Sequence, residues 1–328
     1  MTRSAHPERE TQKRIIKFFQ KELGYNYLGN LEDSENYNVR WGDWKNYLSK
    51  NGYSVSFIES LQNEFAKILS DFSQSSYHTN KEVYRILKYG LKWPEHPGEA
   101  PKTVYFINWE EPEKNDFYIA EEVTVNGNVE KRPDIVLYIN GIAVAVMELK
   151  KSTVSVADGI RQNVTNQREQ FIERFFSTIQ ICVAANDSEG LRYGTFKTPE
   201  KYYLEWKEDN FTDQLQDKDD LDKEIESKCS KQLNLLEQQC YRIFQKERLL
   251  DIIHNFIIFD NGIKKICRYN QFYAIKRCEK RLVRNQGGIV WHTQGSGKSL
   301  TMVWLAKWIL WKDRKKLLND QILDSYNY

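Results

Sequence analysis

The sequence predicts a mixed α/β protein with a central sheet, and three observations lead to that prediction. Apolar residues recur at helical spacing through roughly the first ninety residues, and the period then changes to that of strands. Residues 142–147 are apolar without alternation, which is typical of a strand buried on both faces. Further along, a short apolar run, a glycine loop and a helical pattern follow one another. We therefore expect a sheet-containing domain first and a second α/β unit after it.

Helices are expected before the sheet. Apolar side chains at helical spacing predict helices over residues 7–23, 56–72 and 80–91. Gly24 ends the first helix, and Asn80 is the expected N-cap of the third. Three prolines then break the helical pattern.

The predicted sheet follows these helices. Strand-like runs cover residues 103–108, 116–125, 134–139 and 142–149. Asn140-Gly141 joins the last two runs as the kind of tight turn that closes a hairpin. A helix over residues 156–171 and a strand over residues 178–185 complete this domain.

Composition divides the chain into three parts. Residues 1–206 hold the predicted sheet domain. Residues 207–261 are predicted to be a charged helical connector, because the first half of this segment is strongly charged and low in apolar content. Residues 262–328 are predicted to be a partial nucleotide-binding unit, with a strand at 288–291 and a helix over 298–311.

Composition also excludes several classes of protein. The 328 residues are 40% hydrophobic and 13% aromatic, which excludes global disorder. The 48 Lys and Arg nearly balance 46 Asp and Glu, so any nucleic-acid contact must come from a local basic surface. No apolar run approaches the roughly 18–20 residues that cross a bilayer, and the first ten residues lack a signal-peptide core. The five cysteines form no CxxC pair, which argues against disulfides or structural zinc. We expect a cytoplasmic protein without membrane contact.

Asp134, Glu148 and Lys150 are the first candidate catalytic residues. Thirteen residues separate the two acids, so paired strands can bring both to one end of the sheet, and period 2 puts Glu148 and Lys150 on one face. Both carboxylates, Asp134 and Glu148, can hold Mg²⁺ through hard oxygen ligands, and the metal can activate a water molecule. The lysine can stabilise charge that develops on a phosphate. The alternative is an exposed strand end with an ordinary ion pair.

This segment resembles the PD-(D/E)xK nuclease motif, here Pro133-Asp134 followed by Glu148-Leu149-Lys150. The resemblance extends to the restriction (R) subunit of type I restriction enzymes and covers nearly the whole chain. Beyond the motif it is carried by residues 10–12, 22–25, 27–29, 158–163, 175–180, 190–195 and 202–206. It implies a PD-(D/E)xK restriction-endonuclease-like domain, a helical connector and a partial RecA-like P-loop unit.

The same resemblance implies further site residues. Gln162, twelve residues after Lys150, matches the glutamine of a Q-x-x-x-Y motif that lies near the scissile phosphate in that family. Asn166 stands where the tyrosine is usual, so only Gln162 is carried over as a catalytic residue. Glu10 is a match for an acid on the first helix that supports the metal site in related nucleases. The alternative for Gln162 is an exposed helical glutamine without a role in the site. The alternative for Glu10 is a first-turn glutamate that is there because the helix dipole favours an acid.

A phosphate loop is the second group of candidate residues. Gly295 and Gly297 let the backbone curl so that its N–H groups face an anion. Lys298 would reach the β- and γ-phosphates, and the Ser299 hydroxyl would ligate Mg²⁺. The strict phosphate-loop pattern, G-x-x-x-x-G-K-[ST], has glycine where this chain has His292. The alternative to a phosphate loop is a flexible Gly/Ser turn before a lysine. The expected nucleotide-binding residues here are Thr293, Gly295, Ser296, Gly297, Lys298 and Ser299.

The loop, Thr-Gln-Gly-Ser-Gly-Lys-Ser, resembles motif I of superfamily 2 helicases, which relaxes that first glycine. The resemblance implies an ATP-binding unit. Upstream, Arg268 and Gln271 form an R-x-x-Q element, and such an element reads adenine in the helicases that the chain resembles. A glutamine amide suits that role because it can both donate to and accept from a base edge. The alternative is an ordinary helix start.

As a whole, the resemblance implies a Mg²⁺-dependent endonuclease subunit that cuts unmethylated double-stranded DNA. In the full-length family, translocation depends on ATP, and the partners are methyltransferase (M) and specificity (S) subunits. Only 30 residues follow Lys298, without a DExx-type strand or a second RecA-like domain, so we expect a truncated R subunit. The alternatives are an ATP-independent nuclease and an inactive fragment that binds nucleotide or partner subunits.

Overall fold

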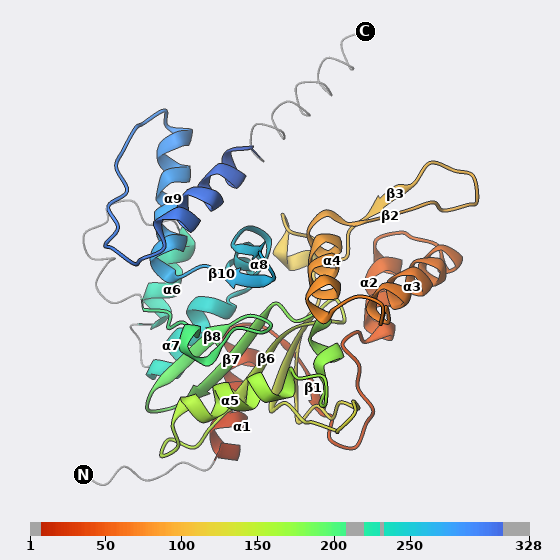
Figure 1. The fold of residues 1–328 in the computed structure, drawn as a ribbon, viewed down its shortest axis with the longest axis horizontal. Helices are drawn as coiled ribbons and strands as arrows, with labels where there is room; N and C mark the ends of the chain where they lie inside the picture. Colours follow the sequence, from red (N-terminus) through yellow and green to blue (C-terminus); the bar gives the residue numbers. More distant parts are fainter. Residues whose placement is uncertain (1–7, 208–219, 230–232, 311–328) are drawn as a thin grey trace.

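The computed structural model describes residues 8–207, 220–229 and 233–310 of the chain, and its centre is a six-stranded sheet (Figure 1). In the order of the sheet, the strands are β1 (Asn26–Asn30), β4 (Phe117–Glu121), β5 (Ile135–Ile139), β6 (Ile142–Leu149), β7 (Ile181–Asn186) and β8 (Gly190–Gly194). Strand β1 runs parallel to β4, and β6 runs parallel to β7. The other neighbours are antiparallel. The predicted mixed central sheet is therefore confirmed.

The β5–β6 hairpin closes at the predicted turn. Asn140 has a φ of 51° and Gly141 a φ of 81°, so both central residues have the positive φ that a type I′ hairpin turn requires. The Asn140 side chain is buried and donates to the carbonyl oxygen of Phe106 at 2.9 Å. A Cβ atom on Gly141 would lie 2.6 Å from the carbonyl oxygen of Arg40, so the close approach also requires glycine.

Helices cover both faces of this sheet. All eight residues of β6 are buried, as the unbroken apolar run predicts. Helix α5 (Val156–Asn166) packs against β6 and β7 on one face. On the opposite face lie α1 (Glu8–Lys21) and α7 (Leu235–Phe244), whose apolar side chains share the main core with the sheet (Figure 1).

The first part of the chain contains one helix more than predicted. The helices after α1 are α2 (Trp41–Lys50), α3 (Val55–Leu69) and α4 (Ser76–Tyr89), and the sequence pattern did not reveal α2. Asn80 as an N-cap is wrong, because Ser75 caps α4 and accepts from the backbone N–H of His78. Asn80 lies inside the helix, where its buried amide donates to the carbonyl oxygens of Phe176, Ser177 and Ile179.

The predicted strand over residues 103–108 is wrong in length and in place. The strand there is β3 (Lys102–Val104), which pairs with β2 (Leu91–Trp93) in a separate antiparallel hairpin that projects from the molecule (Figure 1). The predicted helix over 156–171 ends earlier, at the end of α5. The short 3₁₀ helices are Pro112–Lys114, Glu173–Ser177 and Glu200–Tyr202.

The segment expected to be a connector packs against the sheet domain. It contains α6 (Asp220–Cys229), α7, α8 (Lys246–Asn255) and β9 (Ile257–Asp260). The Gln239 side-chain oxygen accepts from the backbone N–H of Leu191 at 2.6 Å. Strand β9 pairs antiparallel with β10 (Ile263–Ile266), which lies just beyond the predicted end of the connector. On β10, the buried Lys264 ammonium donates to the side-chain oxygen of Gln180 at 2.6 Å. The helical content is as predicted, and the boundaries at 206 and 261 stay predictions.

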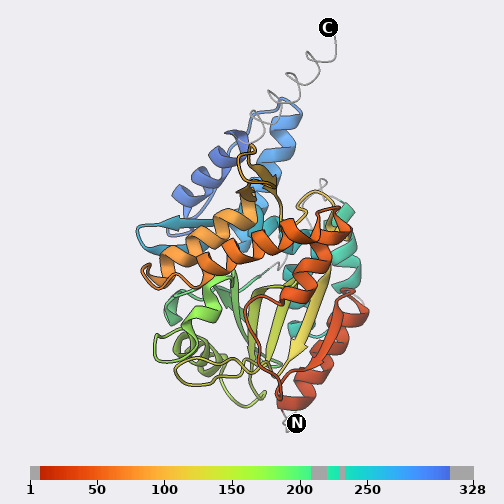
Figure 2. The same cartoon turned by 90° about the vertical axis from the view of Figure 1, so that its right-hand side faces the viewer.

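The predicted strand at 288–291 is wrong for the described structure. Helix α9 (Tyr269–Val283) leads into an extended segment, and a helix covers residues 298–310. Within the described ranges, no strand pairs with residues 288–291, and Ile289 and Trp291 are 92% and 88% exposed. A strand forms only where a neighbour satisfies its backbone groups, and the described residues offer none here. The RecA-like unit is therefore not confirmed. Figures 1 and 2 show α9 and helix 298–310 at the opposite end of the molecule from α1. No helix in the described part is long and apolar enough to span a membrane.

Candidate active site and phosphate loop

Strands β5 and β6 bring Asp134 and Glu148 together. Ile135 pairs with Met147 in the antiparallel register, so Asp134 and Glu148 occupy the next pair of facing positions. Facing residues of antiparallel strands have Cβ atoms about 4.5–5.5 Å apart and point to the same face. The Asp134 carboxylate also accepts a 2.6 Å hydrogen bond from the backbone N–H of Leu149, directly after Glu148.

Glu148 is completely buried, and its two carboxylate oxygens differ in their surroundings. Oε1 accepts a hydrogen bond from the amide of Asn166 on α5 at 3.2 Å. Oε2 has no hydrogen-bond partner among the described residues, although the atom is inaccessible to solvent. Burying a carboxylate oxygen without a partner raises the free energy of the folded state, unless a proton or a cation binds to that oxygen.

The electrostatics of the two acids favour a bound cation. Burial raises the pKa of Asp134 to about 7, and the negative charges of Glu8 and Glu122 raise it further, against the lowering effects of the Leu149 N–H and Lys150. Burial also raises the pKa of Glu148 well above its usual range, and the charge of Asp134 adds to that effect. A divalent cation beside both carboxylates would reverse these penalties, because it favours their ionised forms.

Lys150 lies beside the acids, as the sequence predicts. Its ammonium is 3.6 Å from the carboxylate of Glu8, and its side chain is 14% exposed. The stem of Lys150 packs against α5 at Gly159, where a Cβ atom would lie 3.4 Å from the Lys150 Cγ. The first-helix acid at this site is Glu8, whereas the expected Glu10 is exposed. Glu8 was missed because Glu8 and Glu10 share the first turn of α1, and the sequence does not show which face of that turn meets the sheet.

Two further residues support Asp134, and sequence reasoning missed both. The buried Gln12 amide donates to the carbonyl oxygen of Asp134 at 2.9 Å and to the Glu122 carboxylate at 3.0 Å. Glu122 has a φ of 50°, and its other carboxylate oxygen pairs with Arg132 at 3.0 Å. Such a strained backbone at a polar cluster is typical of functional sites. No signal in the sequence pointed to Glu122, because it lies inside the run 116–125 that was expected to be a single strand, whereas β4 ends at Glu121.

Gln162 lies on the face of α5 that contains the contacts to the site. It follows Gly159 by three residues and precedes Asn166 by four, and these two positions touch Lys150 and Glu148 respectively. Residues at those spacings are neighbours on a helix surface. Gln162 is half-buried, and its role beside the phosphate stays a prediction.

The donor set fits Mg²⁺ held by two protein carboxylates. Within the described ranges, no three His, Cys, Asp or Glu side chains converge to hold a metal on their own. Mg²⁺ needs no such cage, because it keeps several waters and binds through one or two carboxylates together with substrate phosphates. Asp134 and Glu148 provide two such carboxylates, and the Oε2 atom of Glu148 has no hydrogen-bond partner among the described residues.

The phosphate loop has the backbone that its glycines predict. Gly295 and Gly297 have φ values of 78° and 86°, and the helix of residues 298–310 begins directly afterwards. Thr293 and Ser299 are exposed, and the Ser296 hydroxyl donates to the carbonyl oxygen of Thr293 at 2.7 Å. The loop thus exposes Thr293 and Ser299 to solvent.

The Lys298 ammonium folds back over the loop. Its hydrogen bonds are long, at 3.4 Å to the carbonyl oxygen of His292 and 3.5 Å to that of Thr293. The side chain is exposed, and these two contacts hold it weakly.

Arg268 and Gln271 contact this loop directly. The buried Gln271 amide donates to the carbonyl oxygen of Gly297 at 2.9 Å and accepts from the backbone N–H of Arg268 at 2.8 Å. The Arg268 guanidinium donates to the carbonyl oxygen of Gly295 at 3.3 Å. The Gln271 amide thus makes one hydrogen bond through its oxygen and one through its nitrogen, which leaves one N–H and one lone pair for other partners.

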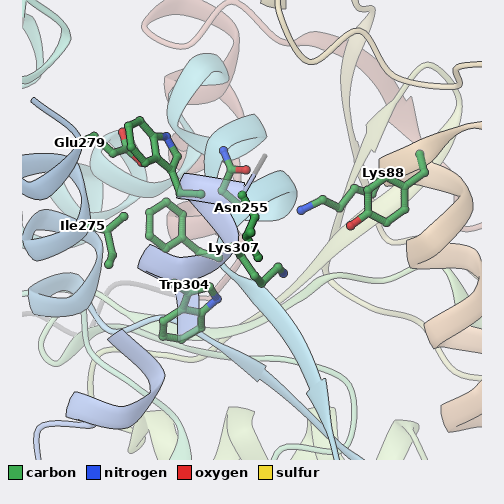
Figure 3. A pocket seen from close by; sticks show the side chains of 10 residues that line it. Lys88, Asn255, Ile275, Glu279, Trp304 and Lys307 are labelled. Carbon is green, nitrogen blue, oxygen red and sulfur yellow. The ribbon is translucent and has the colours of Figure 1, made fainter. Parts of the chain in front are cut away.

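A cavity of about 230 Å³ lies between α4, α8, α9 and helix 298–310 (Figure 3). The labelled side chains that line it are Lys88, Asn255, Ile275, Glu279, Trp304 and Lys307. Burial lowers the pKa of Lys88 to about 7. None of the predicted site residues lines this cavity, so it is separate from both the acid cluster and the phosphate loop.

Comparison with known proteins adds two family matches. Residues 6–202 match the family described as "Type I restriction enzyme R protein N terminus", which is more than half of the chain. Residues 270–323 match the family described as "SWI2/SNF2 ATPase". The first match contains the acid cluster, and the second contains the phosphate loop.

Similar curated proteins belong to restriction systems. A Methanocaldococcus jannaschii protein, provisionally named the type I restriction enzyme MjaIXP endonuclease subunit, is 28% identical over 336 residues, covering 92% of this chain and 31% of that protein. The type I restriction enzyme HindI endonuclease subunit of Haemophilus influenzae is 25% identical over 289 residues, covering 77% of this chain and 26% of that protein. The chain therefore spans about a third or less of the length of these relatives.

Proposed function

The chain belongs to the type I restriction enzyme R protein N-terminal family, and we propose that it supplies the nuclease of such an enzyme. The reaction is Mg²⁺-dependent hydrolysis of phosphodiester bonds in unmethylated double-stranded DNA. Asp134, Glu148 and Lys150 perform it, with Gln162 beside the phosphate. The observation that carries the proposal is the pair of facing buried carboxylates, one with an open oxygen, next to a lysine.

Each of these residues has a role that its surroundings support. Asp134 and Glu148 would hold Mg²⁺, which when bound polarises the phosphate and lowers the pKa of a coordinated water. The Lys150 ammonium stabilises the charge that develops on the phosphate and orients the attacking water. Gln12 keeps Asp134 in place through the hydrogen bond to its backbone carbonyl oxygen.

The wider system follows from the family membership as a proposal. We propose that the protein works with methyltransferase (M) and specificity (S) subunits, and that the S subunit recognises the DNA sequence. In the complete enzyme, ATP-dependent translocation would precede cutting. A role on double-stranded DNA with these partners would place the protein in the cytoplasm.

ATP binding is proposed at the phosphate loop. The residues are Thr293, Gly295, Ser296, Gly297, Lys298 and Ser299, with Arg268 and Gln271 adjacent. The two positive-φ glycines and the helix that starts at Lys298 support this assignment, because together they direct N–H groups and a helix N-terminus at an anion. The short match to an ATPase family supports it as well.

There are two alternative functions. The protein binds nucleotide or partner subunits without cleaving DNA, or it cleaves DNA independently of ATP. Among the described residues, none pairs with the segment at 288–291, and this favours both alternatives because an ATPase core needs that strand within a sheet. Cleavage of closed circular DNA with Mg²⁺, with and without ATP, separates the candidates. No cutting favours a binding protein, and equal cutting without ATP favours the independent nuclease.

Two neighbouring lysines provide a matched test of the proposed site. We expect Lys150→Ala to reduce the rate of cleavage by at least about 10²-fold, which is the usual loss when one transition-state donor is removed. Lys151 is the next residue but is exposed, so Lys151→Ala should cut like the wild type. Asp134→Ala should abolish cutting. Equal activity of the two lysine variants would contradict the assignment.

A further inference from the structure

We propose that Asn166 is a positioning residue whose amide holds Glu148 so that one carboxylate oxygen stays available to the divalent cation. This inference rests on the proposed function, because it requires Glu148 to be a metal ligand. It assigns a role to Asn166, which stands where the Q-x-x-x-Y motif usually has tyrosine and for which the resemblance implied none.

The geometry distinguishes the two oxygens of one carboxylate. Asn166 is the last residue of α5 and is 2% exposed. Its Nδ2 atom donates to Glu148 Oε1 at 3.2 Å. Oε2 of Glu148 is buried, and the described residues give it no partner. Oε1 is therefore held by a hydrogen bond, whereas Oε2 has no hydrogen-bond partner among the described residues. A carboxylate that binds a cation through one oxygen needs this arrangement.

The amide is needed because Glu148 lies in an environment that opposes its ionised form. Glu148 is fully buried and shares the site with the carboxylate of Asp134. A hydrogen bond donated to a carboxylate favours the ionised form, which is the form that binds metal. It also restricts rotation of the carboxylate, so less entropy is lost when the cation binds. Partners of this kind typically contribute about 10–100-fold to metal affinity.

Helix α5 contains a second buried asparagine, Asn163, which bonds to the sheet and not to the acids. Asn163 lies one turn before Asn166 and is 0% exposed, and its Nδ2 atom donates to the carbonyl oxygen of Val183 at 2.7 Å. Asn163 thus anchors α5 to β7, whereas Asn166 contacts the acid. The two residues share type, helix and burial, so Asn163 is the matched control for Asn166.

Calorimetric titration of the 328-residue chain with Mg²⁺, without DNA, tests the inference. Asn166→Ala should raise the Kd for Mg²⁺ about 10–100-fold. Asn166→Leu keeps a side chain of similar volume and should show the same loss, even if the alanine variant is poorly folded. Asn163→Ala should lower the Tm and leave the Kd for Mg²⁺ unchanged. Thermal unfolding of each variant without metal shows which proteins are folded.

Glu148→Gln separates failure of this inference from failure of the proposed function. If Glu148→Gln loses Mg²⁺ binding while both Asn166 variants bind as the wild type does, the inference alone is overturned. Equal losses in Asn163→Ala and Asn166→Ala would overturn it as well, because the effect would then be general docking of α5. If the wild type does not bind Mg²⁺, or Glu148→Gln binds unchanged, the proposed function fails and the inference fails with it.

Discussion

Asp134 is one of the residues whose buried charge makes the stability of the metal-free protein depend on pH. Burial raises its pKa to about 7, whereas an unfolded chain releases this proton near pH 3.9, roughly the usual value. Between these values the folded protein binds more protons than the unfolded chain, so the free energy of unfolding falls as pH rises. We expect Asp134→Asn to remove part of that fall. The measurement is the Tm between about pH 4 and about pH 8 without metal, and parallel curves for the two proteins would contradict this explanation.

Gly159 is the residue that lets α5 lie close to β7 beside Lys150. A Cβ atom there would lie 3.1 Å from the Ala184 Cβ, which is tight, and 3.4 Å from the Lys150 Cγ, which is an ordinary contact. We expect Gly159→Ala to push α5 away from β7 and, because α5 contains Asn166, to lower the rate of cleavage several-fold. Gly42 in α2 has open space around its Cα, so Gly42→Ala should leave cleavage unchanged and stabilise the protein by about 0.5–1 kcal/mol. Cleavage rates and Tm values of both variants test this, and unchanged cutting by Gly159→Ala would contradict it.

Of the residues at the site, the sequence predicted the two acids and the lysine, but not the helix residues that contact them. Asp134, Glu148 and Lys150 lie on two strands joined by a short turn, so local register alone brings them together. Glu8 and Asn166 reach the site from helices α1 and α5. Their contacts depend on how those helices dock, and neither residue type nor helical spacing encodes that docking.

The β5–β6 hairpin is the element on which the geometry of the acids depends. Gly141→Ala would combine a positive φ with a Cβ atom 2.6 Å from a backbone oxygen. The backbone conformation alone costs about 1–3 kcal/mol in a residue other than glycine. We expect a clearly lower Tm and cleavage that is lost together with folding. Denaturant unfolding measures the first effect, and a variant as stable as the wild type would contradict the role assigned to this turn.

The segment between α9 and helix 298–310 is the element expected to be least protected. Backbone groups of residues 287–292 are extended without strand partners in the described structure, whereas β6 is paired on both sides. Amides without such hydrogen bonds exchange quickly. Hydrogen exchange should therefore be fast over 287–292 and slow over β6. High protection over 287–292 would show that this segment is paired in solution.

Elements with strong periodicity were predictable, and short exposed ones were not. Strand β6 was visible because all eight of its residues are apolar or at the site. Strand β1 lies at the sheet edge, and none of its five residues is fully buried, so it shows no alternation. The β9–β10 hairpin was missed because two four-residue strands give too short a pattern.

On the scale of the whole molecule, the acid cluster and the phosphate loop belong to different groups of elements. Strands β5 and β6 with α5 hold the first, and α9 with helix 298–310 holds the second (Figure 1). We expect Lys298→Ala to leave Mg²⁺-dependent cutting by this chain unchanged, and ATP hydrolysis by this chain to show no stimulation by DNA. Cleavage and phosphate-release assays on the same preparations check both. DNA-stimulated ATP hydrolysis would contradict the second expectation.

Locating a bound cation in crystals of the protein tests whether Asp134 and Glu148 hold one together. Mn²⁺ replaces Mg²⁺ in oxygen sites and is visible by anomalous scattering. We expect a peak about 2.0–2.6 Å from a carboxylate oxygen of each residue, on the Oε2 side of Glu148. Crystals of cleavage-competent protein with no Mn²⁺ at these carboxylates, or with Mn²⁺ only elsewhere, would contradict it.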